Sequence, residues 1–213
     1  MELTLIAAFV VAVFLLSVAP GPDMLFIVTN AATGGRRAGL LSALGMSTGL
    51  AVHTVAAALG MGALIQAAPA ALNVVRIAGA LFLAYLAVSA WRASRAAPQP
   101  PPTQTPTPRR PSHKVYLMAI LTNIANPKII LFYLAFVPQF ISTGHTAWPA
   151  WLQLLTLGGL FIVVGLLVDA AVGLTAGSLA EKILHRPSFR RRLERASALI
   201  FGGLAVRLVL DSQ

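Results

Sequence analysis

Six long apolar stretches constrain the fold of this chain more than any other feature of its sequence. A transmembrane helix needs about 20 apolar residues to cross the hydrocarbon core of a bilayer, and all but the last stretch reach this length. None alternates polar and apolar residues, which favours helices over the strands of a membrane barrel. We therefore predict an all-α integral membrane protein with six transmembrane helices. The predicted spans are Leu3–Val28, Gly39–Ile65, Leu72–Trp91, Val115–Phe140, Trp151–Gly177 and Ala196–Leu210.

The composition of the chain excludes a soluble globular domain and a disordered chain. Of its 213 residues, 57% are hydrophobic and 10% are charged, whereas soluble domains are about 45–50% apolar and about 25% charged. The absence of cysteine excludes a disulfide scaffold, a thiolate metal site and a thiol nucleophile. Glu2 stands where a signal peptide has basic residues, so we interpret the first stretch as a span.

The basic residues predict the topology. The net charge is +10, and thirteen of the sixteen Lys and Arg fall in the loops after the first, third and fifth spans. The loops and termini on the other side contain none. Basic residues mark cytoplasmic loops, so both termini are expected outside. Because no aromatic residues alternate with these charges and no nucleic-acid-binding fold surrounds them, we expect contact with membrane lipids and exclude a nucleic-acid partner.

A proline-rich segment divides the predicted spans into two groups of three. The stretch Pro98–Pro111 is rich in Pro, Thr and Gln, a composition typical of an extended, solvated linker. We expect a first three-helix repeat over residues 1–97, a basic cytoplasmic linker over 98–114 and a second repeat over 115–213. Because each repeat has an odd number of spans, the two are inverted in the membrane, as in many secondary transporters.

Prolines interrupt the first span of each predicted repeat. The first break reads Pro20-Gly21-Pro22-Asp23 and the second reads Asn126-Pro127-Lys128. Proline has no backbone N–H and breaks a regular helix, and the carbonyl groups that it frees must be satisfied by protein or by water in a cavity. We predict that a half-helix restarts after each break, with Asn126 as the N-cap of the second.

The breaks also place charges inside the membrane. Asp23 and Lys128 are expected at similar depths, close enough for an ion pair or for a zwitterion held between them. A charge at the centre of a span costs at least about 2.5–3.5 kcal/mol, so such residues are seldom without function. Asp169 is expected in the inner half of the fifth span, where it either pairs with Lys128 or carries a proton.

Other residues within the spans are candidates for the site or for packing. Asn123 precedes the second break and is expected to add a polar contact. His53 lies deep in the second span, where a packing role and a site role are equally open. The pairs Gly45–Gly49 and Gly173–Gly177 have the four-residue spacing of closely packed membrane helices, and such faces are compatible with a homodimer.

The blocks around the two breaks resemble the LysE/RhtB family of amino-acid exporters. Residues 19–24 read APGPDM, similar to the family's Pro-Gly-Pro signature, and residues 121–140 read LTNIANPKIILFYLAFVPQF, similar to its Asn-Pro-Lys block. The two blocks together are specific, and weaker similarity covers almost the whole chain outside the linker. The chain departs from the family at Ala198, where a glycine is usual after the serine. The resemblance implies proton-driven efflux of amino acids or related small metabolites across a bacterial inner membrane.

These inferences combine into alternating access around a site between the two broken helices. The half-helix N-termini, with their unpaired N–H groups, and Lys128 suit a substrate carboxylate. Asp23 or Asp169 suits an α-ammonium group, and one of the two is expected to exchange the proton. The main alternative is an ion or metal-cation exporter on the same scaffold. Against it, the sequence contains no cluster of His and Asp residues with the spacing of metal ligands. We expect no cofactor and no enzymatic activity, since no catalytic motif is present.

Overall fold

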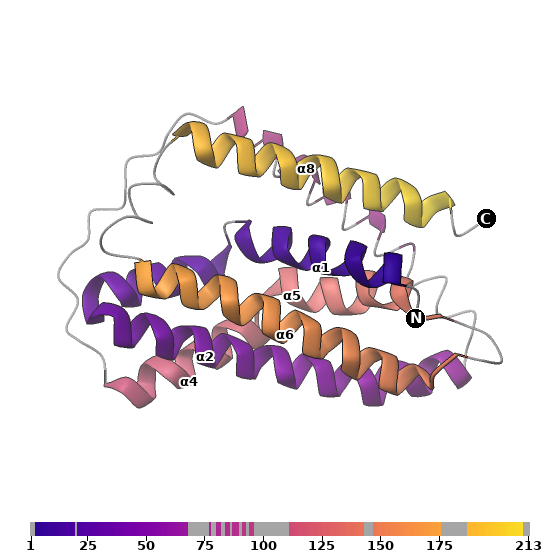
Figure 1. Cartoon of the computed structure of the whole chain (residues 1–213), viewed down its shortest axis with the longest axis horizontal. Helices are drawn as coiled ribbons and strands as arrows, with labels where there is room; N and C mark the ends of the chain where they lie inside the picture. The colour runs from indigo at the N-terminus through magenta and orange to yellow at the C-terminus, as the bar shows by residue number, and fades with distance from the viewer. Residues whose placement is uncertain are drawn as a thin grey trace.

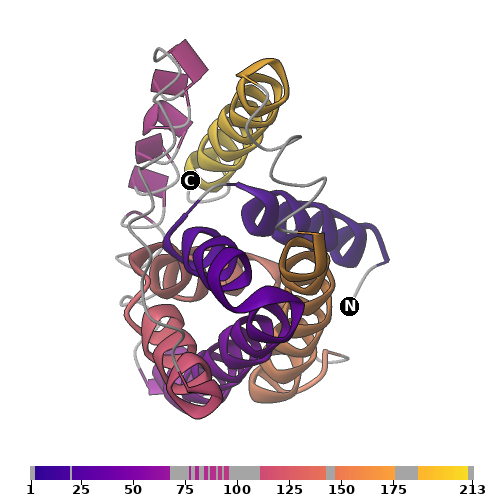
Figure 2. The same cartoon turned by 90° about the vertical axis from the view of Figure 1, so that its left-hand side faces the viewer.

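A computed structural model of the chain shows an all-helical protein. It describes residues 3–19, 21–67, 111–142, 147–175 and 187–210, together with scattered positions between 77 and 95. Within these ranges every regular element is a helix and no strand occurs. The helices run side by side in one bundle (Figure 1), and Figure 2 shows α8 and the described positions of 77–95 on one side of it.

The first half of the bundle contains α1 (Leu3–Val18) and α2 (Pro22–Ala67). The break between them falls at the predicted position, and Pro20 itself lies outside the described residues. Within α2, Gly35 has a φ of 74° and a non-helical backbone, a conformation that glycine adopts without a steric penalty. The chain turns back at this point (Figure 1), which separates the first predicted span from the second.

The second half begins with a helix that is broken in the same way. The segment α4 (Ser112–Ile124) is followed after two residues by α5 (Pro127–Leu131), which continues as a π-helix, η1 (Phe132–Phe136), and a 3₁₀-helix, η2 (Val137–Phe140). The parts before and after the break are bent by 46°. Single turns of π-helix are rare and frequently lie at functional sites.

Two further helices complete the described part of the chain. They are α6 (Ala150–Thr175) and α8 (Pro187–Leu210). Among the described helices, two are long and apolar enough to cross a membrane, or three if the bent pair of α4 and the helix after it counts as one. The predicted span Leu72–Trp91 and the predicted linker lie mostly outside the described residues, so the six-span repeat arrangement stays a prediction.

Glycine allows the long helices to approach closely. A Cβ atom on Gly49 would lie 2.6 Å from Asn123 Oδ1, and one on Gly45 would lie 2.6 Å from Ala119 Cβ, so α2 meets α4 along this stripe. Near the other end of the α2–α6 contact, a Cβ on Gly173 would lie 2.7 Å from the carbonyl carbon of Gly39. Gly45, Gly49 and Gly173 therefore serve packing within the chain, whereas Gly177 lies outside the described residues and the homodimer stays a prediction.

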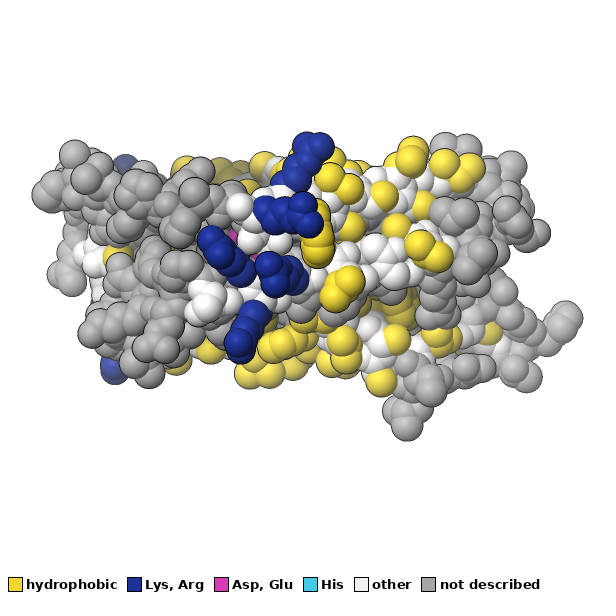
Figure 3. Space-filling view, turned by 90° about the horizontal axis from the view of Figure 1, so that it is seen from above, with side chains coloured by type: hydrophobic (Ala, Val, Ile, Leu, Met, Phe, Trp, Pro, Cys, Tyr) yellow, Lys and Arg dark blue, Asp and Glu magenta, His cyan; other side chains and the backbone are white. Residues whose placement is uncertain are grey.

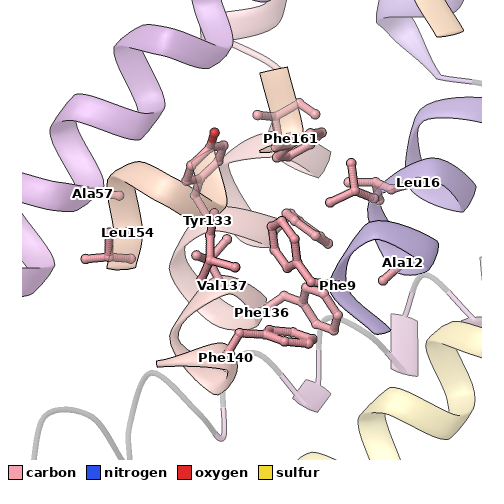
Figure 4. Close-up of a cluster of buried hydrophobic side chains, with 14 of the residues drawn as sticks. Phe9, Ala12, Leu16, Ala57, Tyr133, Phe136, Val137, Phe140, Leu154 and Phe161 are labelled. Atoms are coloured by element: carbon pink, nitrogen blue, oxygen red, sulfur yellow. The ribbon is translucent and has the colours of Figure 1, made fainter. Parts of the chain in front are cut away.

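The core of the bundle is aromatic (Figure 4). Phe9 of α1 packs edge-on against Phe140 with a centroid distance of 5.1 Å, and Phe132 meets Phe161 of α6 at the same distance. Offset and edge-to-face aromatic pairs add about 0.5–1.5 kcal/mol each beyond the area that they bury. This cluster fixes the short helices after the second break against α1 and α6.

The outer surface is largely apolar, with the basic residues concentrated on parts of it. Leu59, Leu167 and Leu199 are each at least 66% exposed, as expected of side chains that face lipid. The Gly35 turn and the starts of α4 and α8 lie at one end of the bundle (Figure 1), and Figure 3 shows Lys and Arg side chains gathered on one part of a face. The exposed basic residues of these three segments are Arg36, Arg37, Lys114, Arg191, Arg192 and Arg195.

Candidate functional site

The two helix breaks meet at a small cavity of about 30 Å³. One part of its wall carries three charged groups, Asp23 from α2, Lys128 from α5 and Asp169 from α6. The rest of the wall is polar near the breaks and apolar elsewhere. The other lining residues are Leu16, Ser17, Ala19, Gly21, Met24, Leu50, Asn123, Asn126, Ile129, Phe161 and Gly165.

Lys128 reaches across the cavity to the end of α1. Its side-chain nitrogen donates hydrogen bonds to the carbonyl oxygens of Leu16, at 2.5 Å, and of Ala19, at 2.9 Å. Residue 20 is proline, so it has no N–H for the Leu16 carbonyl four positions before it. A cation is also favoured at a helix C-terminus, where the last carbonyl groups carry partial negative charge. Lys128 therefore closes the gap that the first break opens.

Asn126 is the N-cap of α5, as the sequence predicts. It is 3% exposed, and its side-chain oxygen accepts a hydrogen bond from the backbone N–H of Lys128 at 3.0 Å. The next two N–H groups, of Ile129 and Ile130, donate to the Asn126 carbonyl, each at 3.1 Å. The expectation that unpaired N–H groups at this half-helix hold a carboxylate is therefore wrong, because the cap uses them.

Asp23 reaches across to the second half of the chain. Its Oδ2 accepts a hydrogen bond from Asn123 Nδ2 at 2.8 Å, and Asn123 is the penultimate residue of α4. Asp23 Oδ1 is buried and accepts no hydrogen bond from the described residues. The charged residue that follows each break thus contacts the end of the half-helix before the other break.

The three charges face one cavity without forming an ion pair. In the described part of the chain no carboxylate oxygen lies within 4.0 Å of the Lys128 nitrogen, although Lys128 interacts electrostatically with Asp23 and Asp169. Of the two arrangements predicted for Asp23 and Lys128, the direct ion pair is therefore absent. The pairing of Asp169 with Lys128 is absent in the same way.

His53 lies behind the cavity. Its Nε2 is 3.4 Å from the carbonyl oxygen of Asn123, and its ring stacks on Tyr133 with centroids 5.6 Å apart. Tyr133 stacks in turn on Phe161, and its hydroxyl is 2.7 Å from the hydroxyl of Thr54 in α2. His53 therefore contacts residues behind the cavity wall, and its role in the site stays a prediction.

The structure brings together most of the residues that the sequence predicts for the site. Gly21, Asp23, Asn123, Asn126, Lys128 and Asp169 line the cavity. Pro22 and Pro127 are exposed and begin α2 and α5. Pro20 lies outside the described residues, so its place in the site stays a prediction.

Sequence reasoning did not find the backbone carbonyls that hold Lys128 or the pair Thr54 and Tyr133. The missing donor at proline 20 is a signal for the Leu16 carbonyl, whereas no pattern in the sequence links Thr54 to Tyr133. Metal ligation finds no support here, since no group of three or more His, Cys, Asp or Glu in the described ranges is placed to hold a metal ion.

Comparisons with known proteins identify a family over nearly the whole chain. Residues 14–212 match the LysE type translocators. The chain is 30% identical to an uncharacterized membrane protein of Vibrio cholerae, with 98% of each chain covered. It is 31% identical to a homoserine/homoserine lactone efflux protein of Salmonella typhimurium, covering 91% of this chain and 90% of the relative.

A leucine efflux protein of Salmonella choleraesuis is 34% identical over 63% of each chain. No solved structure matches the chain. The family match spans both helix breaks and the charged cavity between them, and it confirms the resemblance that the two proline blocks indicated. The protein is a membrane protein that belongs to the LysE type translocator family.

Proposed function

We propose that this protein is a secondary transporter that exports an amino acid or a closely related small metabolite from the cytoplasm. The family match and the relatives with efflux names support export. The observation that carries the proposal is the cavity between the two breaks, because it combines one cationic and two anionic groups in an otherwise apolar bundle. An α-amino acid carries a positive ammonium group and a negative carboxylate group on the same carbon atom.

The polar wall of the cavity provides contacts for both ends of a zwitterion. The ammonium group of Lys128 has three donors, and two of them are used by Leu16 and Ala19. The third donor is available to a substrate carboxylate. Asp169 makes no hydrogen bond to the described residues and lines the same cavity, so it is available to a substrate ammonium.

The size of the cavity supports alternating access. A water molecule needs a cavity of about 10–15 Å³, so a volume of about 30 Å³ admits a water molecule or two and excludes an amino acid. The helices around the site must therefore move apart before substrate enters. The breaks after α1 and α4 and the π-helix η1 are the natural hinges, since they interrupt the rigid hydrogen-bond ladder of a helix.

Proton antiport supplies the driving force in this proposal. A proton and a substrate ammonium group compete when both bind to one cluster of carboxylates, and such competition links export of one to import of the other. Asp23 and Asp169 interact electrostatically across the cavity. One of them exchanges the proton and the other remains for the substrate.

We propose a bacterial inner membrane location, with the basic end of the bundle in the cytoplasm. This orientation follows the excess of basic residues at the Gly35 turn and at the starts of α4 and α8. The start of α1 and the end of α8 lie at the opposite end (Figure 1), which supports both termini on the outer side.

Reconstitution into liposomes tests the function. Purified protein is placed in vesicles loaded with a mixture of amino acids and divalent metal cations, a pH gradient is imposed, and the solutes that leave are identified by mass spectrometry. We expect one chemical group of amino acids to leave faster than from empty vesicles, and Lys128→Ala to abolish this export. Efflux of a metal cation without any amino acid would instead favour the ion exporter.

A further inference from the structure

We propose that Asp23 is the residue that exchanges the coupling proton, while Asp169 and Lys128 hold the substrate. This assignment rests on the proposed function and divides the roles that it leaves open between the two carboxylates. It follows from how each carboxylate is bonded and from the charged groups that face it.

Asp23 has one side-chain donor at hydrogen-bonding distance, and the Asn126 side chain also interacts with its carboxylate. Asn123 donates to Oδ2 at 2.8 Å, whereas the buried Oδ1 has no donor among the described residues. A buried acceptor without a partner is destabilising, and the cost is larger when the acceptor carries a charge. A proton on Oδ1 removes the charge and turns this oxygen into a donor.

Two helix ends act on Asp23 in opposite directions, because it lies in the first turn of α2 and accepts a hydrogen bond from a residue near the end of α4. Its partner Asn123 is in the last turn of α4, where the final carbonyl groups carry partial negative charge. Lys128 has the opposite relationship, because its cation faces the carbonyls at the end of α1. At Asp23 the N-terminus of α2 favours the carboxylate and the end of α4 disfavours it, so the protonated form follows from the buried Oδ1 that lacks a donor in the described part of the chain.

The charged and titratable groups around Asp23 do not pair with it directly. Lys128 faces it from α5, His53 from α2 and Asp169 from α6. The Lys128 nitrogen is bound to two carbonyl oxygens, and His53 Nε2 is directed to the carbonyl of Asn123 at 3.4 Å. Asp23 therefore keeps its proton without a competing ion pair.

The surroundings of Asp169 differ from those of Asp23. It lies within the unbroken helix α6, lines the cavity and has no hydrogen bond to the described residues. A substrate ammonium at Asp169 and a carboxylate at the third donor of Lys128 place a zwitterion between α6 and α5. The positive ammonium then favours the ionised form of Asp23, so the O–H bond breaks and the proton passes to water in the cavity.

Two transport assays in liposomes separate the roles. Export driven by a pH gradient needs the coupling proton, whereas counterflow of labelled against unlabelled substrate at equal pH needs the substrate contacts. For Asp23→Asn we expect the ratio of counterflow to gradient-driven export to rise by about tenfold or more, as loss of a typical coupling predicts. The residual counterflow becomes independent of pH. For Asp169→Asn we expect both assays to lose activity together.

An infrared measurement tests the assignment even if the Asp23→Asn protein does not fold. Infrared difference spectra of the full protein, recorded on adding substrate, should show loss of a protonated carboxyl band, and Asp23→Glu should shift that band. A band that Asp169→Glu shifts instead, or an Asp23→Asn protein that retains a pH-driven rate, would overturn the assignment. Wild-type protein that carries no amino acid in either assay would contradict the proposed function, while infrared difference spectra recorded between acidic and alkaline pH without substrate would still report on the protonation of Asp23.

Discussion

Lys128 Nζ donates a hydrogen bond to the carbonyl oxygen of Leu16, a residue of the opposite half of the chain. This carbonyl lacks a helical donor because residue 20, four positions further on, is proline. The residue that breaks the first helix thus creates the acceptor that holds a residue of the second break. Lys128 is therefore a structural link between the two broken helices as well as a candidate for binding the substrate carboxylate.

Lys128→Met should abolish export and destabilise the fold. Methionine keeps the length of the stem but leaves the Leu16 and Ala19 carbonyls without their donor, and hydrogen bonds to charged groups contribute about 1.5–3 kcal/mol each. Thermal unfolding in detergent and export from liposomes measure the two effects. Lys114→Met makes the same change at an exposed position at the start of α4 and should alter neither. Export at the wild-type rate by Lys128→Met would contradict the binding role, and an unchanged unfolding temperature would contradict the structural role.

Gly49→Ala should disturb the site by displacing Asn123, which donates a hydrogen bond to Asp23. The added methyl group would lie 2.6 Å from Asn123 Oδ1 and 2.7 Å from Asn123 Cβ, so α2 and α4 must separate or Asn123 must release Asp23. Overpacking of this kind costs about 1–3 kcal/mol. We expect a lower unfolding temperature and slower export.

Gly60→Ala is the control for that change. It adds the same methyl group to the same helix, where nothing lies within 4 Å. Equal unfolding temperatures for the two variants would show that the contact between Gly49 and Asn123 does not constrain the packing of α2 on α4.

Local features of the site could be predicted from the sequence, whereas its tertiary pairings could not. Proline positions locate the breaks, Asn126 precedes Pro127 as an N-cap does, and glycine spacing indicates the α2–α4 contact. Each of these depends on neighbours within a few residues along the chain.

The pairings that the sequence did not predict join distant segments. Whether Lys128 contacts a carboxylate or a carbonyl is decided by the position of α1 relative to α5, and the carbonyls of α1 lie closer. The pairing of Asp23 with Asn123 depends in the same way on how α2 crosses α4. The expectation of free N–H groups at α5 failed because its own cap satisfies them.

The hydrogen bond between Tyr133 and Thr54 should couple the π-helix to α2. The two hydroxyl oxygens are 2.7 Å apart and buried. A double-mutant cycle with Tyr133→Phe and Thr54→Val should give a coupling energy of about 0.5–1.5 kcal/mol in thermal unfolding. Export should also slow, because Tyr133 stacks between His53 and the cavity residue Phe161.

A second tyrosine–threonine pair provides the comparison. Tyr116 of α4 and Thr48 of α2 have hydroxyl oxygens 2.8 Å apart, and neither residue lines the cavity. Tyr116→Phe should therefore leave the export rate closer to wild type than Tyr133→Phe does. If Tyr116→Phe slows export more than Tyr133→Phe does, the contact that matters for transport lies between α4 and α2 and not between η1 and α2.

Phe161 should limit the size of the exported side chain. It is buried at 2% exposure and closes the apolar wall of the cavity together with Leu16 and Leu50. Phe161→Leu removes ring volume with less loss of packing than Phe161→Ala, which costs about 3–5 kcal/mol in a well-packed core. Since a methylene group in an apolar pocket changes selectivity by about 10–200-fold, the ratio of bulky to small amino acids exported from mixed-substrate liposomes should rise by about tenfold. Val163→Ala changes a residue on the exposed face of the same helix, at 56% exposure, and should leave that ratio unchanged. An unchanged ratio in Phe161→Leu would show that this wall of the cavity does not contact the substrate.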